Sequence, residues 1–331
     1  MISWSKTSVV VTGAGGFIGS HLVDALLDLG ACVTALVRYN SRNDAGLLQR
    51  IGDKSSQLRV IAGDIRDLET VRSVLSEGEI VFHLAALVGI PYSYLHANEV
   101  VAVNTLGALN VLTAAKECGR TMRKVVITST SEVYGSAQYV PIDENHPKQP
   151  QSPYAASKVS ADALALSFFR SFDLPVAIVR PFNTYGPRQS DRAVIPAVIC
   201  QALTKREISI GNTATTRDFT FVTDTTAGML RVAESDSSIG EEINLGTGRE
   251  ISIGDLTKVI AGLIGSDVVI HHEPERLRPV KSEVTRMLSA NNKAKTMAGW
   301  TPKVSLEDGL SSTIAWVRDH LGLYDPATYR I

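Results

Sequence analysis

The chain has 331 residues, of which 44% are hydrophobic and 20% charged, and its formal net charge is −1. This size and composition indicate a globular protein with one large or two modest domains, and the balanced charge argues against a nucleic acid or an anionic membrane as partner. No apolar stretch approaches the ~18 residues of a membrane span, and the first apolar run soon ends at glycines, so we expect neither a membrane segment nor a signal peptide. Three widely spaced cysteines, Cys32, Cys118 and Cys200, favour reduced thiols in a cytoplasmic protein over a disulfide framework or a metal site.

The first predicted strand runs from Ser8 to Thr12, a β-branched segment typical of a buried parallel strand. Glycines follow at positions 13, 16 and 19, and a helix is predicted from about Ser20 to Leu29. This G-x-x-G-x-x-G pattern indicates a dinucleotide site, in which the glycines permit a tight turn, close approach of a pyrophosphate, and close packing of helix on strand. The phosphates would lie at the helix N-terminus, where N–H groups lack intrahelical partners. The predicted cofactor contacts are Gly13, Gly16, Phe17, Ile18 and Gly19.

The end of the second predicted strand, Ala31 to Val37, bears on the choice of cofactor. An acidic residue there would hydrogen-bond the ribose 2′-hydroxyl and indicate NAD. This chain instead has Arg38, Asn40, Ser41 and Arg42, and the arginines could pair with a 2′-phosphate. The sequence therefore favours NADP over NAD; in the alternative, Arg38 stacks on adenine or faces water.

A third strand is predicted at residues 58–65 and a fourth at residues 79–86. The fourth ends in small side chains that leave room for the dinucleotide, and His83 within it is interpreted as a structural residue. The predicted cofactor contacts here are Leu84, Ala85 and Ala86.

A long helix is predicted from Asn98 to Glu117 and a fifth strand from Arg123 to Thr130. The strand delivers Thr130, Ser131 and Glu132 to the carboxyl edge of the sheet, where ligands bind in open α/β folds.

Tyr154 and Lys158 follow a proline-rich loop and are four residues apart, so on a helix both side chains project from one face. A lysine ammonium favours the phenolate and lowers the tyrosine pKa from about 10, which makes Tyr154 a candidate base. The alternative is a surface pair that merely shares a helix face.

A sixth strand is predicted from Leu174 to Arg180, and the segment Pro181–Arg188 after it is predicted to be loop because of its prolines and glycine. Strands that alternate with helices indicate an α/β protein with a Rossmann-type doubly wound parallel sheet. We expect residues 1–180, with return segments near 215–250, to form a dinucleotide-binding domain, and residues 181–331 to form mainly a smaller substrate-binding domain.

With these motifs the chain resembles, over nearly its whole length, the extended short-chain dehydrogenase/reductase family of nucleotide-sugar epimerases and dehydratases. The resemblance implies a tightly bound, recycled NAD or NADP, a nucleotide-diphosphate sugar as substrate, and a homodimer built on the helices near 98–117 and Tyr154. It also implies that Asp64 and Ile65 read the adenine edge; Asp64 could also cap the next helix, and the two roles do not exclude each other. The implied substrate contacts are Asn183, Arg217, Arg278 and Glu283.

The Thr-Ser-Glu triplet resembles the 4,6-dehydratases in particular. The resemblance implies that Tyr154 deprotonates the sugar 4-hydroxyl with help from Thr130 and Lys158, and that Glu132 then removes the C5 proton before water leaves C6. The product would be a 4-keto-6-deoxy sugar. Ser131 stands where the dTDP-glucose branch has an aspartic acid, which favours the GDP-mannose and N-acetylhexosamine branches.

Three alternatives remain open from the sequence. UDP-glucuronate decarboxylases carry the same triplet, 4-epimerases usually lack the glutamate, and a cofactor-sensing regulatory protein would tend to lose the Tyr/Lys pair. The carboxylate of Glu132 could also simply lie near a helix start.

Overall fold

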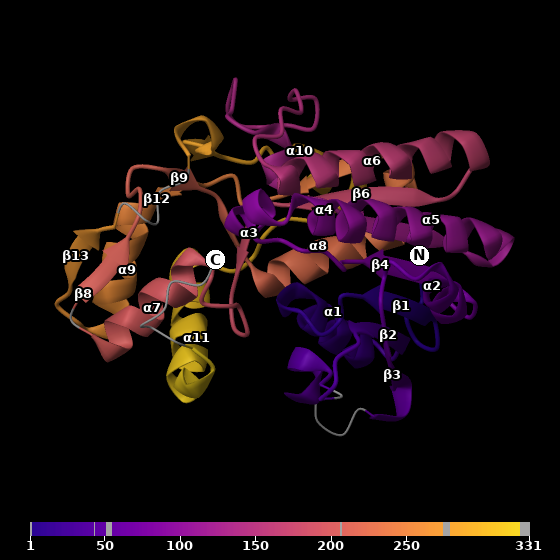
Figure 1. Cartoon of the computed structure of the whole chain (residues 1–331), viewed down its shortest axis with the longest axis horizontal. Coiled ribbons are helices and arrows are strands. Elements are labelled where there is room, and N and C mark those ends of the chain that lie inside the picture. The colour runs from indigo at the N-terminus through magenta and orange to yellow at the C-terminus, as the bar shows by residue number, and fades with distance from the viewer. Residues whose placement is uncertain (1, 43, 51–54, 206, 274–278, 325–331) are drawn as a thin grey trace.

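The computed structural model describes residues 2–42, 44–50, 55–205, 207–273 and 279–324 (Figure 1). Its centre is a seven-stranded sheet in the order β11-β6-β5-β4-β1-β2-β3, with every neighbouring pair parallel. The strands are β1 (Ser8–Thr12), β2 (Cys32–Arg38), β3 (Leu58–Gly63), β4 (Ile80–His83), β5 (Lys124–Thr128), β6 (Val176–Pro181) and β11 (Glu242–Leu245). The Rossmann-type α/β sheet predicted from the sequence is thus confirmed.

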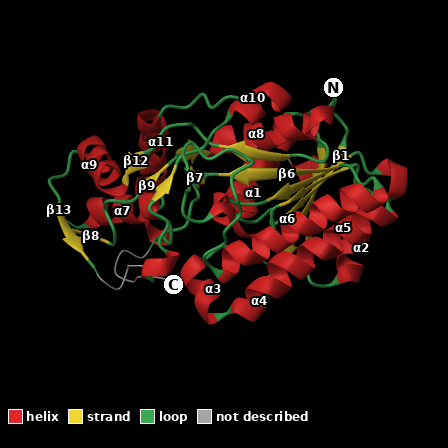
Figure 2. Ribbon diagram, turned by 90° about the horizontal axis from the view of Figure 1, so that it is seen from above, coloured by secondary structure: helices red, strands yellow, loops and turns green. Residues whose placement is uncertain are grey.

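Helices cover both faces of this sheet, so successive strand residues alternate between two apolar cores (Figure 2). Val9 and Val11 pack on the side of α1 and α8, and Val10 packs on the side of α2, α5 and α6. The helices of the first side are α1 (Phe17–Asp28), α8 (Val222–Glu234) and α10 (Asn292–Ala298), and those of the second are α2 (Leu68–Leu75), α5 (Gly107–Glu117) and α6 (Pro153–Phe172).

A third apolar core lies among the elements that follow β6. The helices here are α7 (Val194–Thr204), α9 (Ile253–Ile264) and α11 (Leu306–Asp319). Short strands form three small sheets: β7 (Asn183–Tyr185) with β10 (Phe219–Phe221), β8 (Glu207–Ile210) with β13 (Val269–His272), and β9 (Thr216–Arg217) with β12 (Ile251–Ser252) and β14 (Arg286–Met287). These elements place Arg217 and Asn183 beyond the carboxyl edge of the large sheet.

Two predicted segments differ in the structure. Pro181–Arg188 is not entirely loop, because Asn183–Tyr185 pairs in parallel with β10, and its Thr and Tyr are residue types that favour strands. The helix predicted from Asn98 to Glu117 consists of α4 (Ala97–Val101), a π-helical turn (Ala102–Leu106) and α5. Within the described part of the chain, no helix is long and apolar enough to cross a membrane.

Candidate active site

The Thr-Ser-Glu triplet begins a short 3₁₀ turn, Ser131–Tyr134, directly beyond β5. Thr130 is extended and caps this turn, since its Oγ1 accepts a hydrogen bond from the Glu132 N–H at 3.3 Å. Glu132 therefore lies in the first turn of a short helical segment, as the helix-start alternative proposed. The same turn fixes its carboxylate at the carboxyl edge of the sheet.

Tyr154 and Lys158 lie in the first two turns of α6, which begins at Pro153 and is capped by the Ser152 hydroxyl. Their exposed fractions are only 7% and 3%. The alternative of a surface pair is therefore wrong. The Thr130 side chain hydrogen-bonds the Tyr154 hydroxyl, so the triplet and the Tyr/Lys pair converge.

The electrostatics of this pair differ from the prediction. The pKa of Tyr154 is raised to about 12: burial is the largest cause, the hydrogen bond with Thr130 opposes it, and the charges of Glu132 and Asp162 add to it. Burial likewise lowers the pKa of Lys158 to about 8, against the charge of Asp162. Desolvation thus outweighs the help that the lysine was predicted to give the phenolate.

The glycine-rich turn forms a cradle of bare backbone. Gly13 has φ +71°, and a Cβ there would lie 2.6 Å from the Ala85 nitrogen. A Cβ on Gly19 would lie 2.3 Å from the Gly13 oxygen, so α1 packs directly on the turn. Gly16 caps α1 without any side-chain hydrogen bond, which leaves the first N–H groups of the helix, at Phe17 and Ile18, for a ligand. These residues fit the pyrophosphate of a dinucleotide.

The end of β2 carries the residues predicted to select the cofactor. The Arg38 side chain is 70% exposed and lies 3.8 Å from the Glu99 carboxylate of α4. Asn40 closes the following loop, because its Oδ1 accepts from the Arg42 N–H at 3.1 Å. Ser41 and Arg42 are exposed.

Asp64 follows β3 and is held by Arg66, whose Nη2 lies 2.6 Å from Oδ2. This hydrogen bond lowers the pKa of Asp64. Asp67, and not Asp64, caps α2, so the capping alternative for Asp64 is wrong. Ile65 is buried in the core beneath α2 and α5. Leu84, Ala85 and Ala86 follow β4 and are partly buried.

Two of the four predicted substrate residues lie close together: the Arg217 guanidinium is 3.6 Å from the Glu283 carboxylate. Asn183 lies on β7, its N–H donates to the Asp218 carbonyl, and its buried Nδ2 has no hydrogen-bond partner within the described residues. Arg278 lies outside the described residues. Buried Asp218 organises these loops, since it accepts hydrogen bonds from three backbone N–H groups: those of Thr247, Gly248 and Ser289.

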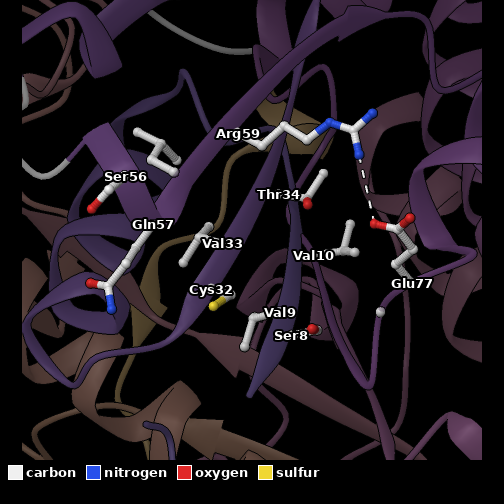
Figure 3. A pocket seen from close by; sticks show the side chains of 12 residues that line it. Ser8, Val9, Val10, Cys32, Val33, Thr34, Ser56, Gln57, Arg59 and Glu77 are labelled. Atoms are coloured by element: carbon white, nitrogen blue, oxygen red, sulfur yellow. Dashed lines mark ion pairs between the residues drawn. The ribbon is translucent and has the colours of Figure 1, made fainter. Parts of the chain in front are cut away.

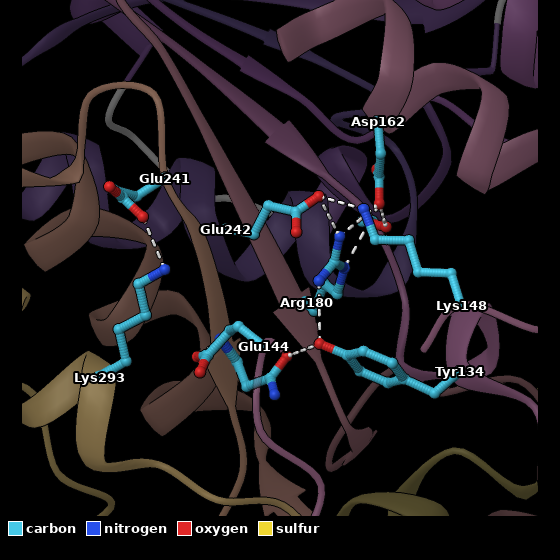
Figure 4. Close-up of polar contacts among 10 residues, drawn as sticks. Tyr134, Glu144, Lys148, Asp162, Arg180, Glu241, Glu242 and Lys293 are labelled. Atoms are coloured by element: carbon cyan, nitrogen blue, oxygen red, sulfur yellow. Dashed lines mark hydrogen bonds and ion pairs between the residues drawn. The ribbon is translucent and has the colours of Figure 1, made fainter. Parts of the chain in front are cut away.

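Several polar residues at the site were missed by the sequence reasoning. The Asn104 side chain joins the π-helical turn to the Leu87 backbone and to the Ser157 hydroxyl. Arg180 and Asp162 form a fully buried ion pair beneath α6 (Figure 4). Two signals pointed to this pair: a charge within the apolar run of β6, and a carboxylate one helical turn after Lys158.

Two other features lie apart from this site. A shallow hollow lies at the amino ends of β1 and β2, opposite the carboxyl edge, and is lined by Ser8, Cys32, Gln57 and an exposed Arg59–Glu77 ion pair (Figure 3). Among the described residues, no cluster of three or more His, Cys, Asp or Glu side chains could hold a metal ion.

Comparison with known proteins places the chain in one family. Residues 10–313 match the family described as GDP-mannose 4,6 dehydratase. A UDP-glucose 4-epimerase of Mycolicibacterium smegmatis is 34% identical over 317 residues, covering 94% of this chain and 98% of the relative. A human dTDP-D-glucose 4,6-dehydratase is 33% identical over 330 residues, covering 94% and 90%. UDP-glucuronic acid decarboxylase 1 of Xenopus tropicalis is 31% identical over 324 residues, covering 96% and 73%.

Comparison with solved structures leads to the same family of proteins. The structure of DesIV, a dTDP-glucose 4,6-dehydratase of Streptomyces venezuelae with NAD bound, superposes with a TM-score of 0.87 at 30% identity, covering 97% of this chain and all of that one. Since sequence and fold agree over nearly the whole chain, the protein belongs to the GDP-mannose 4,6-dehydratase family of extended short-chain dehydrogenases/reductases, whose members include NAD-dependent nucleotide-sugar dehydratases and epimerases.

Proposed function

We propose that the protein is a nucleotide-sugar 4,6-dehydratase that converts its substrate to a 4-keto-6-deoxy sugar. The observation that carries this proposal is the carboxylate of Glu132, which lies close enough to Tyr154 for its charge to raise the tyrosine pKa. Removal of hydrogen from C4 requires only Thr130, Tyr154 and Lys158. A carboxylate beside them supports a further proton transfer, at C5.

The first half of the reaction uses the residues that converge on the Tyr154 hydroxyl. Thr130 hydrogen-bonds the sugar 4-hydroxyl and holds it against Tyr154, which takes its proton, while the Lys158 ammonium stabilises the phenolate. A bound nicotinamide dinucleotide supplies a hydride acceptor at C4, a hydride donor for C6, and a positive charge that lowers the phenol pKa.

In the second half, the 4-ketone acidifies the C5 proton and Glu132 removes it. Ser131 is a poor acid and its side chain is buried. Glu132 itself, once protonated, or a bound water therefore protonates the departing 6-hydroxyl. Asn183, Arg217, Glu283 and Arg278 would hold the nucleotide diphosphate. The Asn183 Nδ2, which has no partner in the part of the chain that the structure describes, supports this assignment. Arginine suits a diphosphate because it binds bidentately.

Glu132→Gln tests the proposal, because the amide keeps the shape of the side chain and removes its basicity. The variant should still oxidise a substrate at C4 while release of water slows by about 100-fold or more. With the unchanged enzyme, mass analysis after incubation with a panel of nucleotide sugars should show loss of one water, and deuterated solvent should label C5. Loss of carbon dioxide from a uronic acid, or inversion at C4 without a mass change, would replace the dehydratase with the decarboxylase or the epimerase.

We also propose a preference for NADP and a homodimer. Exposed Arg38 and Arg42 at the end of β2, where an acidic residue would select NAD, support the first. The second is supported by exposed apolar side chains on neighbouring helices, Leu95 of α3 (Ile90–Leu95), Val101 of α4 and Leu106 of the π-helical turn. Residues 181–331 would supply most of the substrate contacts.

A further inference from the structure

A polar layer lies between the sheet and α6 in an otherwise apolar core. Ser129 follows β5 and its N–H donates to the Val179 carbonyl of β6, so Ser129 and Arg180 lie side by side under the helix. Asp162 of α6 meets both: its Oδ2 accepts from the Ser129 hydroxyl at 2.8 Å and from Arg180 Nη2 at 2.9 Å. The Asp162 and Arg180 side chains have no exposed surface.

The Arg180 guanidinium also contacts groups other than Asp162 (Figure 4). Its Nη2 lies 2.5 Å from Glu242 of β11, and its Nη1 donates to the Tyr134 hydroxyl at 2.9 Å. Lys148 also pairs with Glu242. Arg180 would therefore keep a partly buried carboxylate partner, Glu242, if Asp162 lost its charge.

One atom of Asp162 is not accounted for by these contacts. Its Oδ1 is buried and has no hydrogen-bond partner within the described residues. An unsatisfied buried acceptor destabilises a fold, so it calls for an explanation. Asp162 follows Lys158 by four residues on α6, which places both side chains on one face of the helix.

We propose that Asp162 is a positioning residue for the Tyr154–Lys158 pair: it ties α6 to the end of β5 through Ser129, and it is the fixed counter-charge that keeps the Lys158 ammonium protonated. The inference rests on the proposed function only through proton removal from the sugar 4-hydroxyl, a step that the dehydratase, epimerase and decarboxylase readings share.

The other groups that face Lys158 do not supply this charge. In the cofactor-free protein the phenol of Tyr154 is neutral, because burial is the largest cause that raises its pKa to about 12. His83 of β4 is neutral, since burial and then the charge of Lys158 lower its pKa to about 3. The Thr12 hydroxyl accepts a hydrogen bond from the Ala85 N–H and forms a second one, 2.8 Å long, with His83 Nδ1. Asp162 is the one charged group in the described residues that raises the Lys158 pKa.

The test is the pH dependence of kcat in Asp162→Asn. Activity that needs a protonated Lys158 is lost as pH rises through its pKa, which burial sets near 8 against the charge of Asp162. Removal of that charge lowers the pKa, so the basic limb of the profile should move down by about one pH unit, with kcat near pH 6 and KM within about threefold of the parent. Asp162→Glu keeps the charge and should restore the limb.

Glu242→Gln is the matched control, because it removes one carboxylate from the same Arg180 network without facing Lys158. Its basic limb should stay in place. An unmoved limb in Asp162→Asn, or an equal movement in Glu242→Gln, would overturn the proposal. If Asp162→Asn does not fold, Asp162→Leu combined with Arg180→Met removes the buried pair as a unit and should show the same downward movement.

Any nucleotide sugar that the enzyme turns over serves as the probe. The dehydratase assignment fails if the product mass shows no loss of water. The role of Asp162 fails only if the limb does not move, so the two failures are distinct.

Discussion

We expect the buried charge of Lys158 to destabilise the folded protein. Lys158 is only 3% exposed and burial lowers its pKa from 10.5 to about 8, which means that the fold disfavours the charged form. Lys158→Met keeps an unbranched chain of similar length and removes the charge. The cofactor-free variant should therefore be more stable than the parent at neutral pH, and almost inactive.

The lowered pKa sets the size and the sign of the effect. The penalty is full below the folded pKa of about 8 and disappears as pH rises through the unfolded value of 10.5, because the lysine is then neutral in the unfolded chain as well. At about 1.36 kcal/mol per pKa unit, the variant should gain about 3 kcal/mol at pH 7, about 2 at pH 9 and less than about 1 at pH 10. Near pH 7 this corresponds to a rise in Tm of about 4–5 °C for a chain of this length.

Urea unfolding of cofactor-stripped protein at these three pH values measures the gain directly. Bound dinucleotide must be removed first, because any ligand of the folded state adds its own stabilisation. Lys295→Met is the control, since Lys295 is exposed on α10, and such a change usually alters stability by less than about 0.5 kcal/mol. A variant that is no more stable than the parent at pH 7, or a gain that does not shrink with pH, would refute the reasoning.

Three further outcomes are expected. Tyr154→Phe should fold normally by circular dichroism yet lose at least about 100-fold in turnover, because only the proton acceptor is removed; activity within a few-fold of the parent would remove Tyr154 from the mechanism. Arg38→Asp should shift the ratio of kcat/KM values towards NAD, whereas equal use of both cofactors by the parent would contradict the NADP preference. Sedimentation at micromolar concentration should give twice the chain mass, and a monomer would exclude the proposed dimer.

The sheet was largely predictable because parallel strands covered on both faces need near-continuous apolar runs. β1 has the predicted bounds, β2 is shifted by one residue, β3, β4 and β5 are shorter than predicted, and β6 begins two residues later and ends one residue later than predicted. β7 was missed because a strand of three residues forms only by pairing with β10, and no local sequence pattern indicates that pairing. The π-helical turn was missed for a similar reason, since its Asn104 bonds to Leu87 and Ser157 across the fold.

The site was predictable where chemistry is concentrated in a short motif. Thr130, Glu132 and Tyr154 converge as expected, because the triplet ends a strand whose neighbours fix where α6 starts. The Asp162–Arg180–Glu242 network was only partly predictable: residue types pointed to the Asp162–Arg180 pair, whereas Glu242 joins it only through the pairing of β6 with β11. The energetic balance was also missed: spacing alone suggested a lowered tyrosine pKa, whereas burial decides its direction.

The charge of Glu132 has opposite effects on the two halves of the proposed reaction. Its carboxylate is needed to remove the C5 proton. Burial is the largest cause that raises the pKa of Tyr154, and the charge of Glu132 also raises it, which hinders proton removal at the 4-hydroxyl. Glu132→Gln should therefore ease the first half while it blocks the second. Rapid mixing of the NAD(P)-loaded variant with substrate, followed by the absorbance of reduced nicotinamide, isolates that first half. The acid limb of its rate should lie at lower pH than in the parent, because the phenolate forms more readily without the carboxylate. A limb that stays in place or moves to higher pH would mean that Glu132 does not act on Tyr154, and the observation that supports the dehydratase would lose its basis.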